Sequence, residues 1–559
     1  MLILLLGSLA LFGGSLSHEF VFDDLTVVRD NLALRTLAGL PRLFLRPYPT
    51  SLTGLYRPLT MATFSLNVAL GGPTPWSFHL VNVLLHALTS FFAVILFRVL
   101  TGERRLSLWA GAWFFLLPIH TEAIANVVGR ADLLTTALSL LTLILLIGPA
   151  VRPGTQRPPT IGRSAGTGVL FLLALLSKEQ AIATVPIYVS WVLLEARRQL
   201  RRPLDALWAV RRQLAWLCVG LAAYLGFRFL ALGPHALAGD NTATIVENPL
   251  AHTSTLVRIV TALKILTLYL EKSLWPVTLS SDYAYNQIPL ATGLGDVRVL
   301  VGIAAVGWLL WMLGRPRLDV RDDQRMNHAA HWGIVAALFF WPWLPASNLL
   351  SPIGTNMGER LMYFPSVGLC LMLGMITQRF TACLPRRGAG MGGQGRAPAL
   401  LRRIVVWMVV AGVIGGYGWR CVRRTQDWRN ERTLFLSALA ASPNSIRART
   451  NAAVIFLNDG NVTRAEELLA SAHRIYPRYF FTEHHLGLVY FRQHRYELAE
   501  QQFLTALRLL NEPRVYVNLA RVYLAQGRVE DARAALRKRY AGDDAMAEVV
   551  LKRLLEPHQ

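Results

Sequence analysis

Long apolar stretches recur along this chain of 559 residues, and they restrict its fold more than any other feature. About 20 apolar residues suffice to cross the hydrocarbon core of a bilayer. Hydrophobic residues make up 53% of the sequence and charged residues 16%, with a mean hydropathy of +0.37, which is far too apolar for an ordinary soluble protein. The apolar stretches lie at residues 1–16, 77–100, 106–118, 131–149, 166–177, 181–195, 213–232, 256–276, 297–313, 331–347, 361–380 and 401–419. The sequence therefore predicts an all-α protein that crosses the membrane many times.

The basic residues indicate how the apolar stretches are oriented. The formal charge is +23, but these residues lie in short loops rather than on one soluble face, so we expect no nucleic-acid partner. Lys and Arg accumulate in short cytoplasmic loops. Clusters follow the apolar stretches that end at residues 100, 149 and 195, whereas residues 119–129 and 233–255 contain no Lys or Arg. The loops without Lys or Arg are therefore predicted to lie outside the cytoplasm.

Residues 256–276 do not fit this alternation as a full crossing. The stretch contains Lys264, Glu271 and Lys272, which are costly in hydrocarbon. A helix that lies in the interface or re-enters the membrane keeps every later basic loop inside. We therefore predict about eleven spans, with the first apolar stretch retained because it lacks a basic start and a clear cleavage site.

The C-terminal region repeats with a period of about 34 residues. The matching positions are Ala453, Gly487 and Ala520, then Phe456, Tyr490 and Tyr523, then Ala465, Ala499 and Ala532. Small residues where paired helices approach, with an aromatic residue between them, are typical of tetratricopeptide repeats. About three repeats approach the minimum for a stable stack. Such a solenoid binds a polypeptide in its concave face, or else serves as a structural cap.

These patterns divide the chain into four regions. We predict a membrane domain at residues 1–420, in which residues 17–76 form the first external loop. A linker at residues 421–443 joins this domain to the repeats at residues 444–545. A C-terminal tail follows at residues 546–559.

Two adjacent carboxylates, Asp23 and Asp24, follow the first apolar stretch directly. Neighbouring carboxylates repel each other, and the repulsion raises the pKa of one of them. The pair is a candidate proton acceptor or a candidate ligand of a divalent metal, Mg²⁺ or Mn²⁺. A solvated start of a loop is the alternative explanation.

Further ionisable residues are predicted at the same side of the membrane. They are His120, Glu122, Arg130 and Asp132 around one short turn, Lys178 and Glu179 between two apolar stretches, Glu359 and Arg360 after another, and Arg57 in the first external loop. Arg binds phosphate through two parallel hydrogen bonds, and Lys binds it as a point charge. An ion pair that staples two helices would also explain the turn at Arg130.

Together these residues indicate a reaction outside the cytoplasm. The sequence has no phosphate-binding loop for a nucleotide, and an enzyme facing outward has no direct supply of cytoplasmic nucleotide sugar. A lipid-phosphate-linked donor would meet this need. One Asp would then deprotonate an acceptor hydroxyl, while cations or a metal stabilise the departing phosphate.

Five short motifs make the resemblance to a known family specific. They are Phe22-Asp23-Asp24, Tyr56-Arg57-Pro58-Leu59, His120-Thr121-Glu122-Ala123 with Gly129-Arg130-Ala131-Asp132-Leu133-Leu134, Lys178-Glu179-Gln180, and Gly358-Glu359-Arg360-Leu361-Met362-Tyr363-Phe364-Pro365-Ser366. With the repeats, they resemble the transmembrane and tetratricopeptide-repeat-containing protein O-mannosyltransferases of the GT-C glycosyltransferase superfamily. The chain has fewer repeats than the larger members.

The resemblance implies a GT-C fold that transfers mannose from a dolichyl- or polyprenyl-phosphate donor to Ser or Thr hydroxyls of an acceptor protein held by the repeats. Asp23 or Asp24 would act as base or metal ligand, with Glu122 also in the catalytic group. The donor phosphate would contact residues among Arg130, Lys178, Arg360 and Arg57. His120, Asp132, Glu179 and Glu359 would order the site.

Two other functions stay open at this point. The same enzyme class could glycosylate a lipid or a surface glycan, or the chain could be a non-enzymatic membrane scaffold whose repeats bind partners. The expected location is a bacterial inner membrane with the site facing the periplasm, or an endoplasmic-reticulum membrane with the site facing the lumen.

Overall fold

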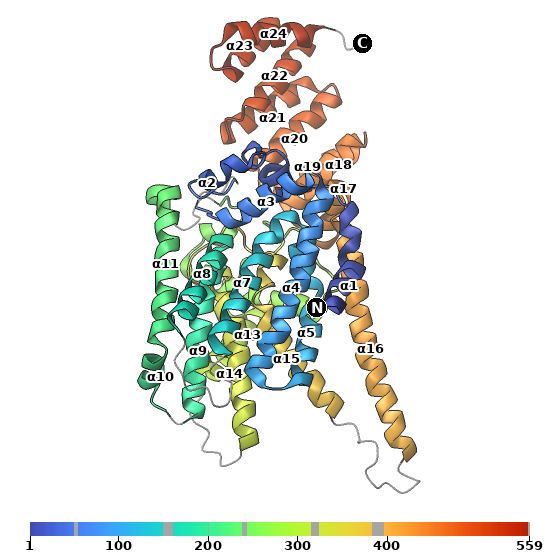
Figure 1. The fold of residues 1–559 in the computed structure, drawn as a ribbon. Coiled ribbons are helices and arrows are strands. Elements are labelled where there is room, and N and C mark those ends of the chain that lie inside the picture. The colour runs from blue at the N-terminus through green and yellow to red at the C-terminus, as the bar shows by residue number, and fades with distance from the viewer. Residues whose placement is uncertain are drawn as a thin grey trace. The chain divides into compact units, whose positions relative to one another are not determined.

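The computed structural model of the protein describes residues 1–49, 54–148, 160–199, 201–236, 243–314, 323–382 and 396–556. Within these ranges the secondary structure is helical and contains no strand, which confirms the all-α prediction (Figure 1). The chain divides into two compact units. The first comprises Met1–Thr244, Asn248–Ser281 and Leu290–Thr433, and the second comprises Ile245–Glu247, Asp282–Pro289 and Leu434–Gln559.

The first unit is built mainly of helices, some of which are joined by short 3₁₀ turns. Its helices are α1 (Leu2–Phe12), α2 (Leu40–Leu43), α3 (Pro58–Gly71), α4 (Pro75–Thr101), α5 (Arg104–Leu116), α6 (Thr121–Ala125), α7 (Arg130–Ile147), α8 (Ile161–Ser177), α9 (Thr184–Arg198), α10 (Pro203–Ala209), α11 (Arg211–Leu232), α12 (Thr255–Leu274), α13 (Val297–Gly314), α14 (Asp323–Trp343), α15 (Ser366–Ala382) and α16 (Arg396–Asp427). Four short turns matter for the site: η5 (Pro118–His120), η6 (Val127–Gly129), η7 (Glu179–Ala183) and η11 (Glu359–Met362).

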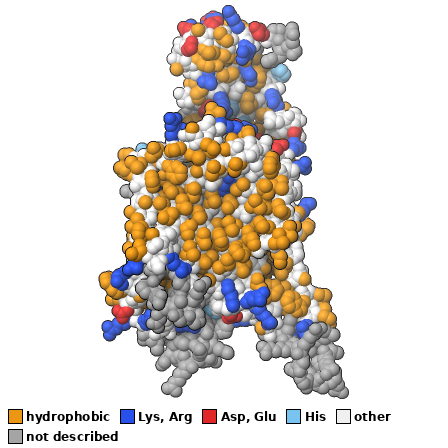
Figure 2. All heavy atoms as spheres, viewed as in Figure 1, with side chains coloured by type: hydrophobic (Ala, Val, Ile, Leu, Met, Phe, Trp, Pro, Cys, Tyr) orange, Lys and Arg blue, Asp and Glu red, His pale blue; other side chains and the backbone are white. Residues whose placement is uncertain are grey.

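Hydrophobic side chains cover the helical face of this unit that Figure 2 shows, and Lys and Arg side chains lie at its margins. Large apolar residues point outward from several helices, among them Phe229 and Leu230 on α11 and Leu300 and Trp311 on α13. Exposed apolar surface on this scale is unfavourable in water but suits a lipid environment.

Five helices of the described chain are long and apolar enough to cross a membrane: Pro75–Thr101, Val127–Ile147, Arg211–Ala236, Val297–Gly314 and Leu401–Asp427. A sixth results if Arg104–Leu116 and Pro118–Ala125, bent by 49°, count as one broken span. By length and composition, therefore, fewer helices of the described chain qualify as membrane spans than the predicted number of about eleven. Other apolar stretches form shorter helices, such as α8 and α15 with 17 residues each and α9 with 15.

Close backbone contacts hold some of these helices together. A Cβ at Gly168 on α8 would lie 2.6 Å from the carbonyl oxygen of Trp216, and one at Gly220 on α11 would lie 2.7 Å from the carbonyl oxygen of Gly168. Only glycine permits this approach, which is a common way to pack helices in membranes. Helix α12 is not among the five candidate spans, and its Lys264 pairs with Asp296 at 2.8 Å.

The second unit consists mainly of paired helices. They are α18 (Ile446–Asn458), α19 (Val462–Ile475), α20 (Phe480–Arg492), α21 (Tyr496–Leu509), α22 (Pro513–Ala525), α23 (Val529–Arg539) and α24 (Asp544–Leu555). The predicted small residues Ala453, Gly487 and Ala520 are buried in the first helices of successive pairs. A Cβ at Gly487 would lie 2.6 Å from the ring of Phe503, so the period of about 34 residues reflects tight helix pairing.

The residues between the last span and the repeats are largely helical. Residues 421–443, which the sequence suggested as a linker, form the end of α16 and helix α17 (Glu431–Ala441). Within the second unit, the buried carboxylate of Asp282 accepts hydrogen bonds from Ser445 and Arg447 at 3.1 and 2.7 Å. A segment distant in sequence thereby covers the start of α18.

Candidate active site

The adjacent carboxylates of the first loop differ in their surroundings. Phe22 has a positive φ of 53°, which is uncommon outside glycine and turns the chain sharply before Asp23. The Asp23 side chain keeps 35% of its surface exposed. Asp24 is fully buried, and its Oδ1 accepts the N–H of Val128 at 2.9 Å while its Oδ2 accepts that of Val127 at 3.3 Å. Asp23 is therefore accessible, whereas Asp24 ties the first loop to η6.

Burial changes the proton affinity of Asp24. It raises the pKa of Asp24 to about 7, although hydrogen bonds from backbone N–H groups act in the opposite direction. A third such bond comes from Val21 at 3.4 Å. The Asp24 carboxylate is thus an internal acceptor for three N–H groups.

Arg360 lies between two carboxylates that come from distant parts of the sequence. Its Nη2 is 3.7 Å from Oδ2 of Asp23, and its Nε is 3.7 Å from Oε1 of Glu122 on α6. The backbone N–H of Arg360 also donates to Oε2 of Glu122 at 3.2 Å. Burial lowers the pKa of Arg360, but the carboxylates of Glu122 and Asp23 outweigh it, so that the pKa is raised. Arg360 therefore stays charged, and 28% of its side chain is exposed.

A second charged group contains Arg57, Lys178, Asp132 and Glu179. Arg57 donates two hydrogen bonds to Glu179 at 2.6 and 3.2 Å, and Lys178 Nζ lies 2.6 Å from Oδ1 of Asp132. Burial alone would raise the pKa of Glu179. The positive charge and the hydrogen bonds of Arg57 outweigh this effect, and the pKa is lowered to about 2. The Arg57–Glu179 pair is partly exposed, whereas the Lys178–Asp132 pair is nearly buried.

The two charged groups are close enough to influence each other. Arg360 interacts electrostatically with Asp132 and Arg57, and it also affects Lys178. The structure thus brings together Asp23, Glu122, Arg360, Arg57, Lys178, Asp132 and Glu179 from separate motifs. We refer to these seven residues as the charged cluster.

Arg130 has a different environment. It is fully buried, its Nε donates to Asn82 at 2.9 Å, and its Nη2 donates to Asn67 at 2.9 Å and to the carbonyl of Phe78 at 3.0 Å. Its guanidinium also lies 4.6 Å from the ring centroid of Phe64. The preceding Gly129 is needed because a Cβ there would collide with the carbonyl of Ala123. Arg130 therefore joins α7 to α3 and α4 through these hydrogen bonds.

His120 is also buried away from solvent. Its Nε2 lies 2.7 Å from Oγ of Ser366, and its ring packs against those of Phe114 and Tyr363. Glu359 is buried next to Arg360, where its Oε1 accepts the N–H of Ser280 at 2.6 Å. His120 lies two residues before Glu122, and Glu359 lies directly before Arg360, so both belong to segments that carry the charged cluster.

The arrangement around Asp23 and Asp24 bears on metal binding. Among the residues that the structure describes, no group of three or more His, Cys, Asp or Glu side chains could hold a metal ion. Both oxygens of Asp24 accept backbone N–H groups, so this residue does not fit the role of a ligand. Asp23 is accessible, but one carboxylate alone does not define a metal site.

Two residues that hold the site were not assigned to it from the sequence. Tyr269 on α12 accepts the N–H of Gly358 at 3.0 Å and donates to its carbonyl at 3.2 Å, and Arg424 on α16 pairs with Glu359 at 3.4 Å. Neither residue belongs to a recognisable motif, so only the unusual charges within α12 and α16 could have drawn attention to them.

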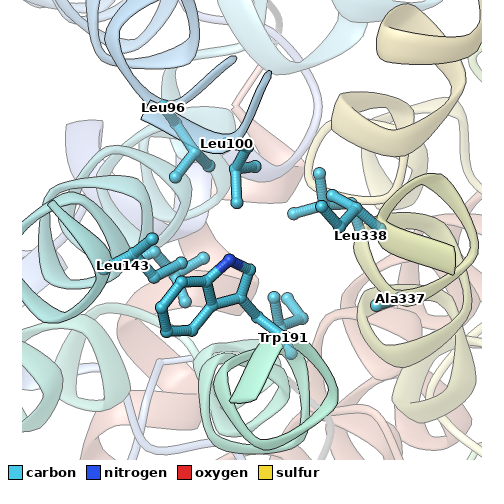
Figure 3. Close-up of a pocket in the computed structure, with 9 residues that line it drawn as sticks. Leu96, Leu100, Leu143, Trp191, Ala337 and Leu338 are labelled. Atoms are coloured by element: carbon cyan, nitrogen blue, oxygen red, sulfur yellow. The ribbon is translucent and has the colours of Figure 1, made fainter. Parts of the chain in front are cut away.

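A separate apolar pocket lies deeper among the helices (Figure 3). It is lined by Leu96, Leu100, Leu143, Ile147, Ile187, Trp191, Ile334, Ala337 and Leu338 from α4, α7, α9 and α14. Leu143 is eleven residues from Asp132 along α7, which corresponds to about 16 Å. No lining residue is charged, so this pocket is distinct from the charged cluster.

Comparison with known proteins identifies the relatives of this chain. The family described as Protein O-mannosyl-transferase TMTC, DUF1736, matches residues 242–310, and a tetratricopeptide repeat family matches residues 485–545. Protein O-mannosyl-transferase TMTC2 of Mus musculus is 27% identical over 85% of this chain. Protein O-mannosyl-transferase TMTC4 of Homo sapiens is 30% identical over 83% of this chain. The chain is a relative of the TMTC proteins.

The predicted family resemblance and the tetratricopeptide repeats are thus confirmed. The chain spans 61% of the mouse TMTC2 relative and 64% of the human TMTC4 relative, so each relative is considerably longer than the matched part. Among solved structures, ArnT from Cupriavidus metallidurans bound to undecaprenyl phosphate is 13% identical, covering 81% of this chain and 79% of that chain, with a TM-score of 0.38. That score is too low to define the fold.

Proposed function

We propose that this protein is an integral-membrane glycosyltransferase that moves mannose from a dolichyl- or polyprenyl-phosphate donor to Ser or Thr hydroxyls of a protein outside the cytoplasm. The observation that carries the proposal is the accessible pair of Asp23 and Arg360, an acid and a cation 3.7 Å apart beside Glu122. The relatives named protein O-mannosyl-transferases support the sugar and the acceptor.

Asp23 is assigned as the general base. Its partly exposed carboxylate accepts the proton of the acceptor hydroxyl while the hydroxyl oxygen forms a bond to C1 of mannose. The bond from C1 to the phosphate oxygen breaks, and the phosphate leaves with the electron pair. Asp24 is assigned to holding the loop, because its oxygens already accept three N–H groups.

Arg360 is assigned to the donor phosphate. Its contacts to Asp23 and Glu122 are longer than ordinary charged hydrogen bonds, so a phosphate can replace them at little cost. Preorganised positive charge stabilises the developing charge on the leaving phosphate. Arg57 and Lys178 add positive charge nearby. Arg130 would first have to break its hydrogen bonds to Asn82, Asn67 and Phe78, so we assign it to helix packing.

A divalent metal, Mg²⁺ or Mn²⁺, stays a prediction. Asp23 is the residue of the acid pair that could contact it, together with the donor phosphate, and the metal would supply additional positive charge to the leaving group. The proposal for Asp23 and Arg360 does not depend on it.

The wider architecture is also part of the proposal. We assign the first unit to the GT-C fold, with shorter helices completing about eleven crossings and with the charged cluster outside the cytoplasm. The basic loops support this orientation. The repeats would hold the acceptor polypeptide in the second unit.

A transfer assay with purified protein tests the proposal. Synthetic polyprenyl-phosphate mannose is supplied with a peptide that contains Ser and Thr or with the same peptide carrying Ala, and the products are analysed by mass spectrometry. Addition of one hexose to the first peptide alone is expected. Transfer to lipid or glycan but not to peptide would favour the alternative acceptor, and no transfer from any lipid-linked sugar would favour a scaffold.

A further inference from the structure

A buried ion pair connects the Arg360 segment to the last long helix of the first unit. Glu359 on η11 and Arg424 on α16 have fully buried side chains, and Nη2 of Arg424 lies 3.4 Å from Oε2 of Glu359. Nη1 of Arg424 also lies 2.9 Å from Asp427, one turn further along α16. Buried charges are costly unless they are paired, so removing one partner of this contact disturbs the arrangement of the other.

Glu359 is held from a second direction as well. Its other oxygen accepts the N–H of Ser280 at 2.6 Å, and Tyr269 contacts both backbone polar groups of the adjacent Gly358. The residue that precedes Arg360 is therefore fixed between α16 and the region of α12.

The end of α16 also packs close to the segment that carries Glu122. Cys421, one turn before Arg424, donates from its Sγ to the carbonyl of Leu116 at 3.3 Å, just before η5 and α6. Arg424 thus sits near both residues that position Arg360: Glu359 through an ion pair and Glu122 through its charge.

Arg360 itself is held much less tightly at its guanidinium. Its two ion pairs are 3.7 Å long, whereas its backbone N–H donates to Glu122 at 3.2 Å. The backbone of this residue is consequently fixed by its surroundings while the side chain keeps freedom to meet a ligand. Such support for a binding group matters because a displacement of about 1 Å can lower a reaction rate about 100-fold.

We propose that Arg424 is a positioning residue that aims Arg360 at the donor phosphate by fixing Glu359. This inference rests on the proposed function. Without Arg424, the buried carboxylate of Glu359 loses this ion pair and shifts, and the backbone that leads into Arg360 shifts with it. The contact to the donor phosphate is weakened, while the acceptor contacts are unchanged.

The test compares the KM for polyprenyl-phosphate mannose with the KM for the acceptor peptide in four variants. Arg424→Gln removes the cation of the pair, and Glu359→Gln removes the carboxylate. Arg424→Lys keeps the positive charge but cannot contact Glu359 and Asp427 through two separate nitrogens. Arg423→Gln is the matched control, because Arg423 is an exposed arginine on the same helix. We expect Arg424→Gln and Glu359→Gln to raise the donor KM about 10- to 100-fold. The acceptor KM should stay within about twofold, Arg424→Lys should be intermediate, and the control should behave as wild type.

A purely structural role gives a different pattern. The thermal midpoint and the amount of folded protein would fall, but the folded fraction would keep the donor KM of wild type, and that result would overturn the proposal. If Arg424→Gln yields no folded protein, Glu359→Gln and Arg424→Lys decide, and a wild-type donor KM in both overturns it. Failure of the proposed function is recognised separately, because wild type itself then transfers no sugar from any lipid-linked donor.

Discussion

Two arginines that the sequence presents alike have opposite environments. Arg360 has 28% of its side chain exposed, and its contacts to Asp23 and Glu122 are 3.7 Å long. Arg130 is fully buried, and its guanidinium donates to Asn82, Asn67 and two backbone carbonyls at 2.9–3.3 Å. Because Arg360 is accessible and its contacts to carboxylates are long, its guanidinium can bind a ligand. The guanidinium of Arg130 already donates hydrogen bonds within the protein, so Arg130 stabilises the fold. The same contrast separates Asp23 from Asp24.

The largest effect is expected at Asp23. Asp23→Asn removes the general base but no buried hydrogen bond, so kcat should fall about 10²- to 10⁴-fold. The thermal midpoint in detergent should be unchanged within error. Sugar transfer from synthetic polyprenyl-phosphate mannose, normalised to folded protein, measures the first quantity. A variant with wild-type kcat would remove Asp23 from the reaction.

Arg130→Gln should act on stability instead. It removes a buried guanidinium and takes the Arg130 donors away from Oδ1 of Asn82 and Oδ1 of Asn67, which should cost about 3–5 kcal/mol. We expect a lower thermal midpoint and a lower yield, with a near-normal donor KM in the molecules that fold. A raised donor KM at an unchanged thermal midpoint would instead indicate that Arg130 binds the donor phosphate. Arg163→Gln on α8 provides a control at an exposed arginine.

Asp24 should produce a dependence of stability on pH. Burial raises its pKa to about 7, compared with about 3.9 in an unfolded chain, so the folded protein holds the proton more tightly. This contribution is complete below about pH 4 and is lost as the pH rises through about 7, by on the order of 2–4 kcal/mol. The thermal midpoint of wild type should decrease over this range, and that of Asp24→Asn should decrease less. Parallel curves for the two proteins would contradict the assignment.

The smallest effect is expected at Arg57. Its ion pair with Glu179 is partly exposed, and such pairs contribute less than about 1 kcal/mol. Arg57→Gln should therefore change stability little and raise the donor KM about two- to fivefold, since 1.4 kcal/mol corresponds to a factor of ten. A loss as large as that of Asp23→Asn would place Arg57 in direct contact with the leaving phosphate.

Periodicity and motifs predicted much of this molecule. Small residues at Ala453, Gly487 and Ala520 predicted the paired helices, because each position lies where two helices approach closely. The apolar stretches predicted helices but not how many are long enough to span a membrane. Hydropathy averages over a window, whereas helix ends depend on local breaks, such as the 49° bend between Arg104–Leu116 and Pro118–Ala125.

The site was only partly predictable for a related reason. The motifs contained the residues of the charged cluster, but their spacing along the chain does not reveal which side chains face solvent. Asp23 and Asp24 are adjacent, yet the turn at Phe22 and the N–H groups of Val127 and Val128 give them opposite surroundings. Arg424 was not assigned to the site because its partner Glu359 lies 65 residues away in the sequence.

A double-mutant cycle at Asp23 and Arg360 tests most directly whether the two residues act in one reaction. The rate of mannose transfer is measured for wild type, Asp23→Asn, Arg360→Gln and the double variant. Residues that act as a unit give losses that do not multiply, so the double variant should be about as slow as the slower single variant. Wild-type rates in both single variants, or losses that multiply fully in the double variant, would contradict the account.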